Sequence, residues 1–460
     1  MRYDIERRDV LKGLGATGIA GLAGCIGGGG AGNDNETSDT GDGSGDGGGD
    51  GTDDGGDGNG NMSGGPDVIN VIGYPESGIQ LFRDYYKSTD GEQKIIVPDG
   101  LRDATLPKEV SNEMANVTGT APAASGPNQK AFTEMFKDEY DQEPGVFNSH
   151  SYDAVAVLIL ANVAAGANDG TKIRDQMRRV ANPGGQKYGP EDFVEAVKAA
   201  SRGEDINYQG ASSVVDFDKM GDPASAAYDV WKFDSSTDSG IKTLDTIDFE
   251  GDPGGEMADS SPGGKDRTAK VGILLPETGD LGSVGSLMIK AARIPVKQVN
   301  DAGINISIDA QVEDTQTTKT ASLSGANALV SAGYPAICGP ASSGNNIPVS
   351  QQVYIKQGIV GCSPSSTALT VTNLKDDDFV FRTAPSDLLQ GQVMAQVASE
   401  RLNGKTASTL YVNNSYGQQL SEKFSNTFTG DYSGEIFQKV SFNKGESSYT
   451  SVINKAISSN

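Results

Sequence analysis

Short apolar runs and longer amphipathic segments alternate along most of the chain. The runs VINVI at residues 68–72 and TLYV at residues 409–412 are each followed by a segment in which apolar residues recur at helical spacing. A period near two predicts a strand, and a period near 3.6 predicts a helix. Strands and helices that alternate in this way predict an α/β fold in which parallel sheets are flanked by helices.

The most apolar segment, AVAVLILANVAAG, spans 13 residues from position 154. Because a helix needs roughly 20 residues to cross a bilayer, this segment is predicted to be a buried helix. His150, the chain's one histidine, precedes it without a nucleophile-elbow motif, so no hydrolase and no enzyme is expected. Asp153 is expected to serve helix-start electrostatics. The sequence holds no phosphate-loop lysine motif and no metal-ligand cluster, so no cofactor is expected.

Two low-complexity stretches divide the chain. From Ile26 to Gly65 nearly every residue is Gly, Asp, Asn, Ser or Thr. Such a composition cannot bury a core, so it predicts an extended tether. A second Gly/Pro/Asp-rich stretch, Phe249–Arg267, is predicted to be a linker between two blocks of similar size, 66–248 and 268–460.

The outer ends of these blocks complement each other. The chain ends in SVINKAISSN, a helix-like segment with a polar exit, where an α/β chain would next supply a strand. The first block opens with PDVINVIGY, a turn that runs straight into a strand. Joining Asn460 to Pro66 would give a continuous helix–turn–strand, and chain breaks are well tolerated in such a turn. The blocks therefore stand in the order expected of a circular permutation.

Acidic residues outnumber basic ones by 62 to 37, which gives a net charge of −25 spread over the chain. Because Lys and Arg are not clustered, nucleic acid is excluded as a partner. The charge favours adaptation to high salt, which screens it within a few ångström, over a general role in solubility. Cys338 and Cys362 end short apolar runs and are expected to be buried free thiols; a disulfide is the alternative if these runs form neighbouring strands.

The N-terminal sequence contains a pattern typical of an export signal. Arg7 and Arg8 precede a short Gly/Ala-rich apolar run that ends in Leu-Ala-Gly-Cys at Cys25. This pattern resembles a twin-arginine signal joined to a lipobox, which implies that Cys25 is lipidated and holds the protein on the outer face of the cytoplasmic membrane. An amphipathic N-terminal helix is the alternative, but the glycine content disfavours a helix.

The second block runs through AKVGILLPETGDLGSVG, PAICGPASSGNN, GIVGCSPSSTALT, FVFRTAPSDLLQG and TLYVNNSYGQQ. This order resembles the N-terminal half of the branched-chain-amino-acid-type substrate-binding proteins of ABC transporters. VINVIGYPESG, KIIVPDG and SHSYDAVAV in the first block resemble the C-terminal half. The resemblance implies a circularly permuted type I periplasmic-binding-protein fold, with two Rossmann-like lobes, three hinge crossings and parts of both lobes in each block. Halves of two tandem binding proteins are the alternative.

In a permutant, the linker 249–267 would join the family's original termini, and at about 3.3 Å per residue it could span up to roughly 60 Å. Ligand would bind between the lobes, at the carboxyl ends of the strands. Ser343 and the run Ser365, Ser366 and Thr367 each follow a strand and precede a helix, so their hydroxyls could cradle one carboxylate. Helix capping is the alternative role.

The resemblance assigns the carboxylate to Ser343 and Thr367, and the ammonium to the backbone carbonyl of Ser365. It also implies that Tyr416, Tyr74 and Asp99 come from the other lobe, with Asp99 paired to the ammonium. A turn residue at Asp99 and core edges at the two tyrosines are the alternatives.

Val284 stands where relatives often carry an aromatic residue, which weakens any expectation of leucine-like specificity. The function implied is a lipid-anchored receptor that passes an amino acid or a related small polar solute, such as an amide, to an ABC permease. A ligand sensor or surface interaction protein on the same fold is the alternative.

Overall fold

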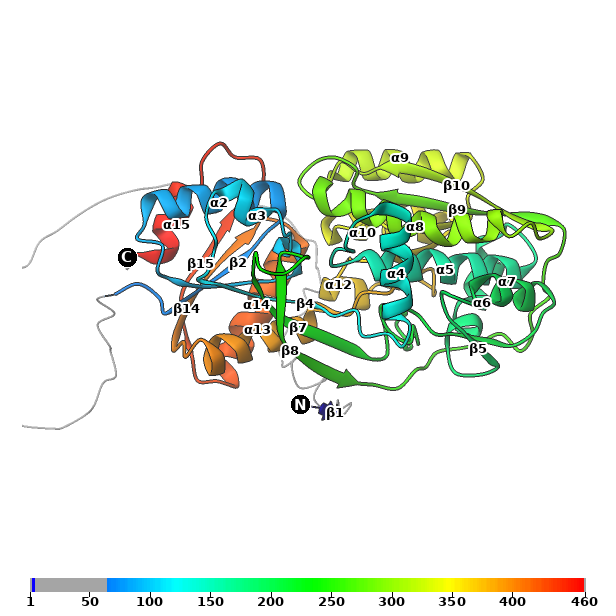
Figure 1. Cartoon of the computed structure of the whole chain (residues 1–460), viewed down its shortest axis with the longest axis horizontal. Coiled ribbons are helices and arrows are strands. Elements are labelled where there is room, and N and C mark those ends of the chain that lie inside the picture. The colour runs from blue at the N-terminus through cyan, green and yellow to red at the C-terminus, as the bar shows by residue number, and fades with distance from the viewer. Residues whose placement is uncertain (1, 5–63, 459–460) are drawn as a thin grey trace, which may run out of the picture. The chain divides into compact units, whose positions relative to one another are not determined.

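Two large sheets, each covered by helices, make up the described part of the chain, which is residues 2–4 and 64–458 of a computed structural model (Figure 1). Arg7, Arg8 and Cys25 lie outside these residues, as does nearly all of the expected tether. The export signal, the lipid anchor and the tether therefore stay predictions.

The larger sheet contains parallel and antiparallel strands. Its strands are β1 (Arg2–Asp4), β2 (Val68–Ile72), β3 (Lys94–Val97), β4 (Val117–Pro122), β7 (Ala226–Phe233), β8 (Ile241–Glu250), β14 (Thr406–Val412) and β15 (Glu435–Phe442). They lie in the order β1-β8-β7-β4-β3-β2-β14-β15. The run from β15 to β4 is parallel, whereas β7 is antiparallel to both β4 and β8. We term this sheet and its helices the mixed lobe.

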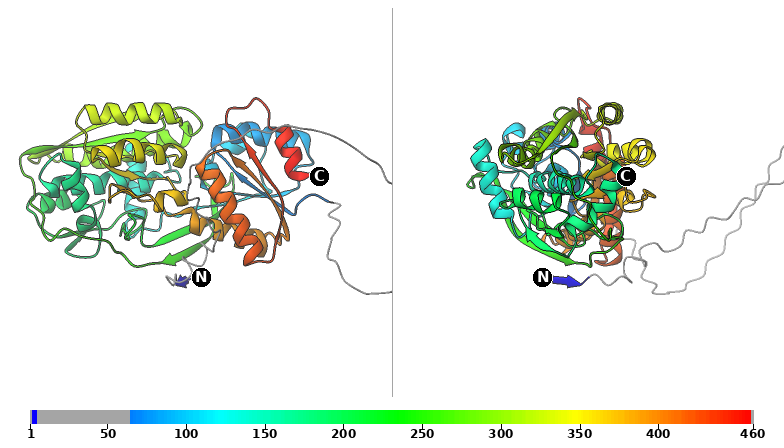
Figure 2. Two further views of the ribbon diagram at one scale, coloured as in Figure 1. Left: turned by 180° about the vertical axis from the view of Figure 1, so that it is seen from behind. Right: turned by 90° about the vertical axis from the view of Figure 1, so that its right-hand side faces the viewer.

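Helices cover both faces of the mixed sheet. Figures 1 and 2 show α2 (Pro75–Ser88), α3 (Leu106–Val110) and α15 (Thr450–Ile457) on one face, and α13 (Asp387–Gln396) and α14 (Ser415–Gly430) on the other. The π-helical turn η3 (Val397–Arg401) continues α13. Helix α2 buries Leu81, Phe82 and Tyr85 and exposes Arg83, the one-sided pattern of a helix that packs on a sheet.

The second sheet is wholly parallel and defines what we term the parallel lobe. Its strands are β9 (Arg267–Leu275), β10 (Ile306–Asp314), β11 (Ala336–Cys338), β12 (Val360–Ser363) and β13 (Val380–Arg382), in the order β10-β9-β11-β12-β13. Its further elements are α4 (Gln129–Tyr140), α5 (Asn148–Ala165), α6 (Gly170–Ala181), β5 (Gln186–Tyr188), α7 (Phe193–Ser201), β6 (Ile206–Tyr208), α8 (Gly282–Asp301), α9 (Lys319–Ser331), α10 (Ser343–Val349), η2 (Ser350–Tyr354), α11 (Ile355–Gln357) and α12 (Leu369–Thr372). The α/β architecture predicted from the alternating pattern is confirmed.

Helix α5 is the central helix of the parallel lobe. All of its 18 residues are buried, against α6, α7, α8 and the sheet, which confirms the buried helix predicted for this apolar segment. Within residues 2–4 and 64–458, no single helix has the length and apolar character to cross a membrane; only α5 and α6 taken together do, and these are bent by 114°.

Two expectations for buried polar groups are resolved. Asp153 does not act at the start of a helix, because it lies inside α5, where its carboxylate accepts hydrogen bonds from the Tyr208 hydroxyl and from the amide and hydroxyl of Ser212. Cys338 and Cys362 are direct partners on the neighbouring strands β11 and β12, yet both are buried free thiols. A disulfide was the alternative if the two runs formed neighbouring strands. They do form neighbouring strands, but the two cysteines are free thiols, which was the first expectation.

The first strand of one block pairs with a strand of the other. Val68–Ile72 lies parallel to β14, with Val71 opposite Leu410. The end of α15 also lies beside the start of β2. A Cβ atom on Gly65 would be only 2.6 Å from the carbonyl oxygen of Ile457. Asn460 itself lies outside the described residues.

The predicted linker joins the two lobes. Its first residues extend β8 to Glu250 and its last residue opens β9, and residues 251–266 form neither helix nor strand. It lies against the parallel lobe, where Gly263 N donates to Ala164 O at 2.9 Å. The described chain passes between the sheets after β4, before β7, through this linker and after β13. The resemblance implies three crossings between the lobes, and the linker is a fourth.

Candidate ligand-binding site

One wall of the site comes from two loops of the parallel lobe. Ser343 begins α10 after β11, and Ser365, Ser366 and Thr367 follow β12. Because β11 and β12 are parallel neighbours, both loops leave the same edge of the sheet. The Ser343 hydroxyl accepts hydrogen bonds from the Ser366 hydroxyl at 3.3 Å and from the Ala368 amide at 3.2 Å. We term residues 343 and 365–367 the hydroxyl wall.

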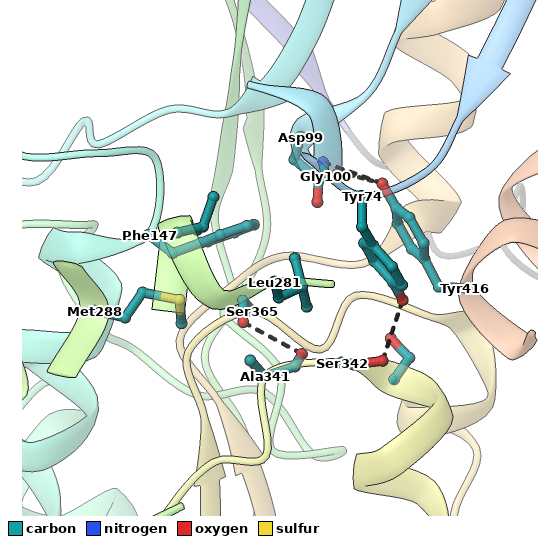
Figure 3. Close-up of a pocket in the computed structure, with 12 residues that line it drawn as sticks. Tyr74, Asp99, Gly100, Phe147, Leu281, Met288, Ala341, Ser342, Ser365 and Tyr416 are labelled. Atoms are coloured by element: carbon teal, nitrogen blue, oxygen red, sulfur yellow. Dashed lines mark hydrogen bonds between the residues drawn. The ribbon is translucent and has the colours of Figure 1, made fainter. Parts of the chain in front are cut away.

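The opposite wall comes from the mixed lobe. Tyr74 follows β2, Asp99 opens the 3₁₀ turn η1 (Asp99–Leu101) after β3, and Tyr416 lies in the first turn of α14 after β14. These three strands are neighbours in the sheet, so the side chains gather at one edge. The two tyrosine rings stack with centroids 5.6 Å apart, and the Tyr416 hydroxyl donates to Asp99 Oδ1 at 3.2 Å (Figure 3).

A small cavity, with about 20 Å³ of free space, lies between these walls. Its lining includes five of the six ligand-binding residues predicted from the sequence, namely Tyr74, Asp99, Ser343, Ser365 and Tyr416. Thr367, the sixth, is fully buried and is not among the lining residues, although its hydroxyl has no hydrogen-bond partner in the described part of the chain.

An apolar surface completes the cavity. Leu281, Val284 and Met288 come from the start of α8, and Phe147 precedes α5 (Figure 3). Val284 was singled out from the sequence, whereas the other three were not. Behind Phe147 lies the ring of His150, edge-on at 5.6 Å, and burial lowers the pKa of this histidine to about 3. His150 therefore packs as a neutral ring near the site.

Two acidic side chains share the buried interior of the mixed lobe. Burial raises the pKa of Asp99 to about 6, although the hydrogen bond from Tyr416 acts in the opposite direction. Asp387, the first residue of α13, is fully buried, and the side chains of Thr367 and Arg382 act to lower its pKa. Burial and the charge of Asp99 raise the pKa of Asp387 well above its usual value. A cation in this region would relieve the repulsion between the two carboxylates.

Hydrogen bonds cross between the lobes around the cavity. The Tyr74 hydroxyl lies 3.1 Å from the Ser342 hydroxyl, and the Ser283 hydroxyl donates to Asp103 Oδ2 at 2.7 Å. The Lys444 ammonium also donates to the carbonyl oxygen of Thr317. These contacts hold the two walls against each other, which is the arrangement of a closed cleft.

Comparison with known proteins finds a family match for the second half of the chain. Residues 268–460 match the model of a family described as periplasmic binding protein, and the chain is similar to that family over these residues. The match includes the hydroxyl wall and Tyr416, whereas Tyr74 and Asp99 lie outside it.

The chain is also similar to individual binding proteins. It is 25% identical over 190 residues to the leucine-, isoleucine-, valine-, threonine- and alanine-binding protein of Pseudomonas aeruginosa, covering 41% of this chain and 50% of that one. It is 32% identical over 159 residues to Leu/Ile/Val-binding protein homolog 1 of Brucella abortus, covering 33% and 41%. The chain spans about half the length, or less, of these curated relatives. The matches confirm the resemblance to substrate-binding proteins of branched-chain amino acid transporters.

Among solved structures, the chain resembles the substrate-binding protein LivJ of Streptococcus pneumoniae in complex with isoleucine. The identity is 27%, the TM-score is 0.37, and the match covers 41% of this chain and 53% of that one. A leucine-binding protein of Thermotoga maritima matches at 23% identity with a TM-score of 0.35, covering 39% and 50%.

Sequence reasoning missed Phe147, Leu281, Met288 and Asp387. The apolar three sit in helical or loop segments where an apolar residue predicts only a core position. Asp387 follows Ser386, whose hydroxyl accepts from Leu388 N at 3.3 Å, so the local pattern is that of an ordinary helix start. That its carboxylate is buried near Asp99 is visible only in the folded structure.

Proposed function

We propose that the chain is an extracytoplasmic solute-binding lipoprotein that captures an amino acid between its lobes and delivers it to an ABC permease. The observation that carries the proposal is the cavity whose walls come from both lobes, with small hydroxyls on one side and a buried carboxylate on the other. The names of the curated relatives, which bind leucine, isoleucine and valine, support this ligand class.

In this proposal, each wall binds one charged group of the amino acid. Ser343 and Thr367 hold the carboxylate, and the carbonyl oxygen of Ser365 accepts a hydrogen bond from the ammonium. Asp99 supplies the counter-charge, a charge-assisted contact that is strong in a buried cleft. Tyr74 and Tyr416 close the cavity from the same side. Because each lobe offers only half of the contacts, the ligand favours the closed arrangement and shifts the hinge equilibrium toward it.

The apolar surface supports a more specific ligand. A side chain that leaves the ligand's α-carbon away from both charged walls would meet Phe147, Leu281, Val284 and Met288. Burying an aliphatic side chain there is favourable by about 0.8 kcal/mol per CH₂ group, whereas a charged side chain would lose its hydration. We therefore propose an aliphatic amino acid.

We also infer a circular permutation of the family fold. The family match stops at one contiguous half, and the curated relatives are matched over about half of their length. The other half of this chain supplies β2, β3 and β4, which continue the sheet begun by β15 and β14. Two tandem halves would not be expected to share one sheet with the first strand of one block directly beside a strand of the other.

Thermal denaturation of the purified chain against the twenty amino acids tests the ligand class. A ligand at about a hundred times its Kd should add about 2.7 kcal/mol to the free energy of unfolding, a clear rise in Tm. We expect the rise with leucine, isoleucine or valine. The analogues 4-methylpentanoic acid, which lacks the ammonium, and isoamylamine, which lacks the carboxylate, should give little. If the two analogues raise Tm as much as leucine does, the proposed roles of the two walls in binding the carboxylate and the ammonium are contradicted.

A further inference from the structure

Arg382, the last residue of β13, is a fully buried cation outside the cavity lining. Its guanidinium donates from Nε to Asp222 Oδ1 and from Nη2 to Asp222 Oδ2, both at 2.5 Å. The side chain of Arg382 has no solvent exposure, and that of Asp222 is 10% exposed. The Thr372 hydroxyl accepts from the same guanidinium and donates to Asp222 Oδ2 at 2.7 Å. Both Asp222 oxygens and two of the three guanidinium nitrogens therefore have partners within this group.

The third guanidinium nitrogen points to the hydroxyl wall. Arg382 Nη1 donates to the carbonyl oxygen of Ser366 at 3.1 Å and to that of Ala368 at 3.3 Å, the two residues that flank Thr367. The carbonyl oxygen of Thr367 itself accepts from the Asp387 amide at 2.8 Å. The three consecutive carbonyls are thus held from behind, while the amide of Ala368 and the hydroxyl of Ser366 face Ser343.

We propose that Arg382, held by Asp222, is a positioning residue for the hydroxyl wall. It does not touch the ligand but fixes the backbone that presents Ser365 and Thr367. The guanidinium suits this task because its planar fork reaches two partners in fixed directions, which a lysine ammonium cannot do. Buried ion pairs contribute little net stability on average. Holding the loop at residues 366–368 gives the Arg382–Asp222 pair a role other than stabilising the fold. The inference rests on the proposed function of the wall as a carboxylate site.

The same lobe offers a matched control. Arg178, on α6, is also buried and pairs with Asp378 through Nη1 at 2.9 Å and Nη2 at 3.0 Å. It too holds backbone carbonyls, those of Asp218 and Lys219. Among the described residues, its hydrogen bonds do not reach residues 365–368. Asp378 is 40% exposed, and the turn that carries Asp222 keeps its own hydrogen bonds between Asp218 and Asp222. Asp378→Asn is therefore expected to disturb an Arg–Asp pair of this lobe with less effect on the wall than Asp222→Asn.

Hydrogen–deuterium exchange of the ligand-free chain tests the positioning role directly. Asp222→Asn should raise exchange in a peptide spanning residues 364–370 and leave most of the lobe unchanged. Asp378→Asn should leave that peptide at the wild-type level. Arg382→Lys, which keeps the charge but loses the fork, should resemble Asp222→Asn and serves if Asp222→Asn does not fold. Unchanged exchange in residues 364–370, or an equal rise in Asp378→Asn, would overturn the proposal.

Calorimetry with L-leucine as the probe tests the consequence for binding. Loss of loop order should weaken binding by roughly tenfold in Asp222→Asn, as expected for one hydrogen bond lost or misplaced, and by less than threefold in Asp378→Asn. In a double-mutant cycle, the effect of Asp222→Asn on the binding free energy should be non-additive with that of Thr367→Val, because Thr367 lies on the loop that Arg382 holds. It should be additive with that of Asp99→Asn, because Asp99 does not lie on this loop. Additivity with both would overturn the proposal. If the wild-type chain binds none of the amino acids, the proposed function fails, and the exchange experiment still decides whether Arg382 orders the loop.

Discussion

Ser77 and Asp280 lie on opposite lobes, and Asp280 Oδ1 accepts hydrogen bonds from both the amide of Ser77, at 3.2 Å, and its hydroxyl, at 2.5 Å. Ser77 is in the first turn of α2, a helix whose own N-cap residue, Tyr74, makes no side-chain capping bond. The carboxylate of Asp280 thus performs from the parallel lobe the capping that a Ser or Asp usually performs within its own helix.

Asp280→Ala should weaken ligand binding more than it weakens the fold. If the lobes separate when the ligand leaves, the open form has already lost this cap, so the substitution raises the free energy of the closed form alone. A helix cap contributes about 1 kcal/mol, which corresponds to roughly fivefold in Kd. Isothermal titration calorimetry with the amino acid found by the thermal screen measures this change.

Asp314→Ala provides the control for this prediction. Asp314 accepts from the Thr278 hydroxyl at 2.6 Å and from the Glu277 amide at 2.9 Å, contacts made within the parallel lobe. Its loss should lower Tm without a selective loss of affinity. If Asp280→Ala leaves Kd unchanged, the contact between Ser77 and Asp280 does not contribute to closure.

Asp99→Asn should reduce affinity for an amino acid by about 1.5–3 kcal/mol, on the order of ten- to a hundredfold, because it removes the ammonium's counter-charge and keeps the shape. The matched ligand is the 2-hydroxy acid of the same skeleton, which lacks the ammonium. Calorimetry should show a much smaller change for that ligand. An unchanged affinity for the amino acid would remove Asp99 from the site.

Affinity for an amino acid should rise as the pH increases from about 5 to 7.5. Burial raises the pKa of Asp99 to about 6, so the closed cleft binds a proton in the window between the usual carboxyl pKa and about 6. The ammonium requires the ionised form, so binding must release that proton at the lower pH. The same raised pKa means that ionising Asp99 in the ligand-free closed form lowers stability as pH rises through this window. Titrations in buffers of different ionisation enthalpy measure the proton release.

Asp387→Asn should leave this pH profile close to that of the wild type. Burial and the charge of Asp99 raise the pKa of Asp387 well above its usual value, so Asp387 stays protonated where Asp99, with a pKa of about 6, ionises. Asparagine in its place therefore removes no charge from the cleft in this pH range. A clearly flatter profile in the variant would mean that Asp387 is ionised beside Asp99.

Much of the fold could be predicted from periodicity because each local pattern agreed with its neighbours. VINVI reads as a buried strand, and residues 68–72 are all buried in β2 beside β14. The hairpin of β7 and β8 was not predicted. A partly exposed residue recurs at every third position of β7, and β8 is largely exposed until Ile247, so neither strand carries the continuous apolar run that marks the parallel strands.

The site was predictable only in part, for reasons that lie in the third dimension. Ser343, Ser365 and Tyr416 follow strands directly, so their place at the sheet edge follows from the chain order. Asp387 and Arg382 lie in segments that read locally as a helix start and a strand end. Their roles depend on Asp99 and Asp222, which are far away in sequence and come from the other block.

Cys25→Ser should release the protein from the membrane into the medium, and Arg7→Lys combined with Arg8→Lys should block export. The lipid attached at Cys25 would be the anchor, and the twin arginines would be the export address. Cell fractionation followed by immunoblotting distinguishes the two effects. Cys338→Ser, which changes a buried thiol of β11, should alter neither. A Cys25→Ser protein that stays in the membrane fraction would contradict the anchor.

The permutation predicts that the block order can be reversed without loss of the fold. A rearranged chain that runs from residue 257 to 460 and then from 66 to 256 restores the family order and keeps every described helix and strand except β1, the edge strand that pairs with β8. Its new junction closes a short gap, since Gly65 already lies against Ile457. Its new ends lie between β8 and β9, in a segment without regular structure and beside the exposed Met257.

The rearranged chain should keep the ligand affinity of the wild type within a few-fold, because it loses only the edge pair of β1 with β8 and keeps every cavity residue. Its Tm should fall modestly, because the cut linker no longer ties β8 to β9 and closure of that loop is lost. The control is a second rearrangement with the same junction at 460 and 66 but with its ends between Val157 and Leu158. There α5 is wholly buried, so the break exposes its core and unsatisfied backbone groups, and this chain should not fold. Circular dichroism and calorimetry compare the two chains. If the first also fails to fold, the two blocks are not exchanged halves of one fold.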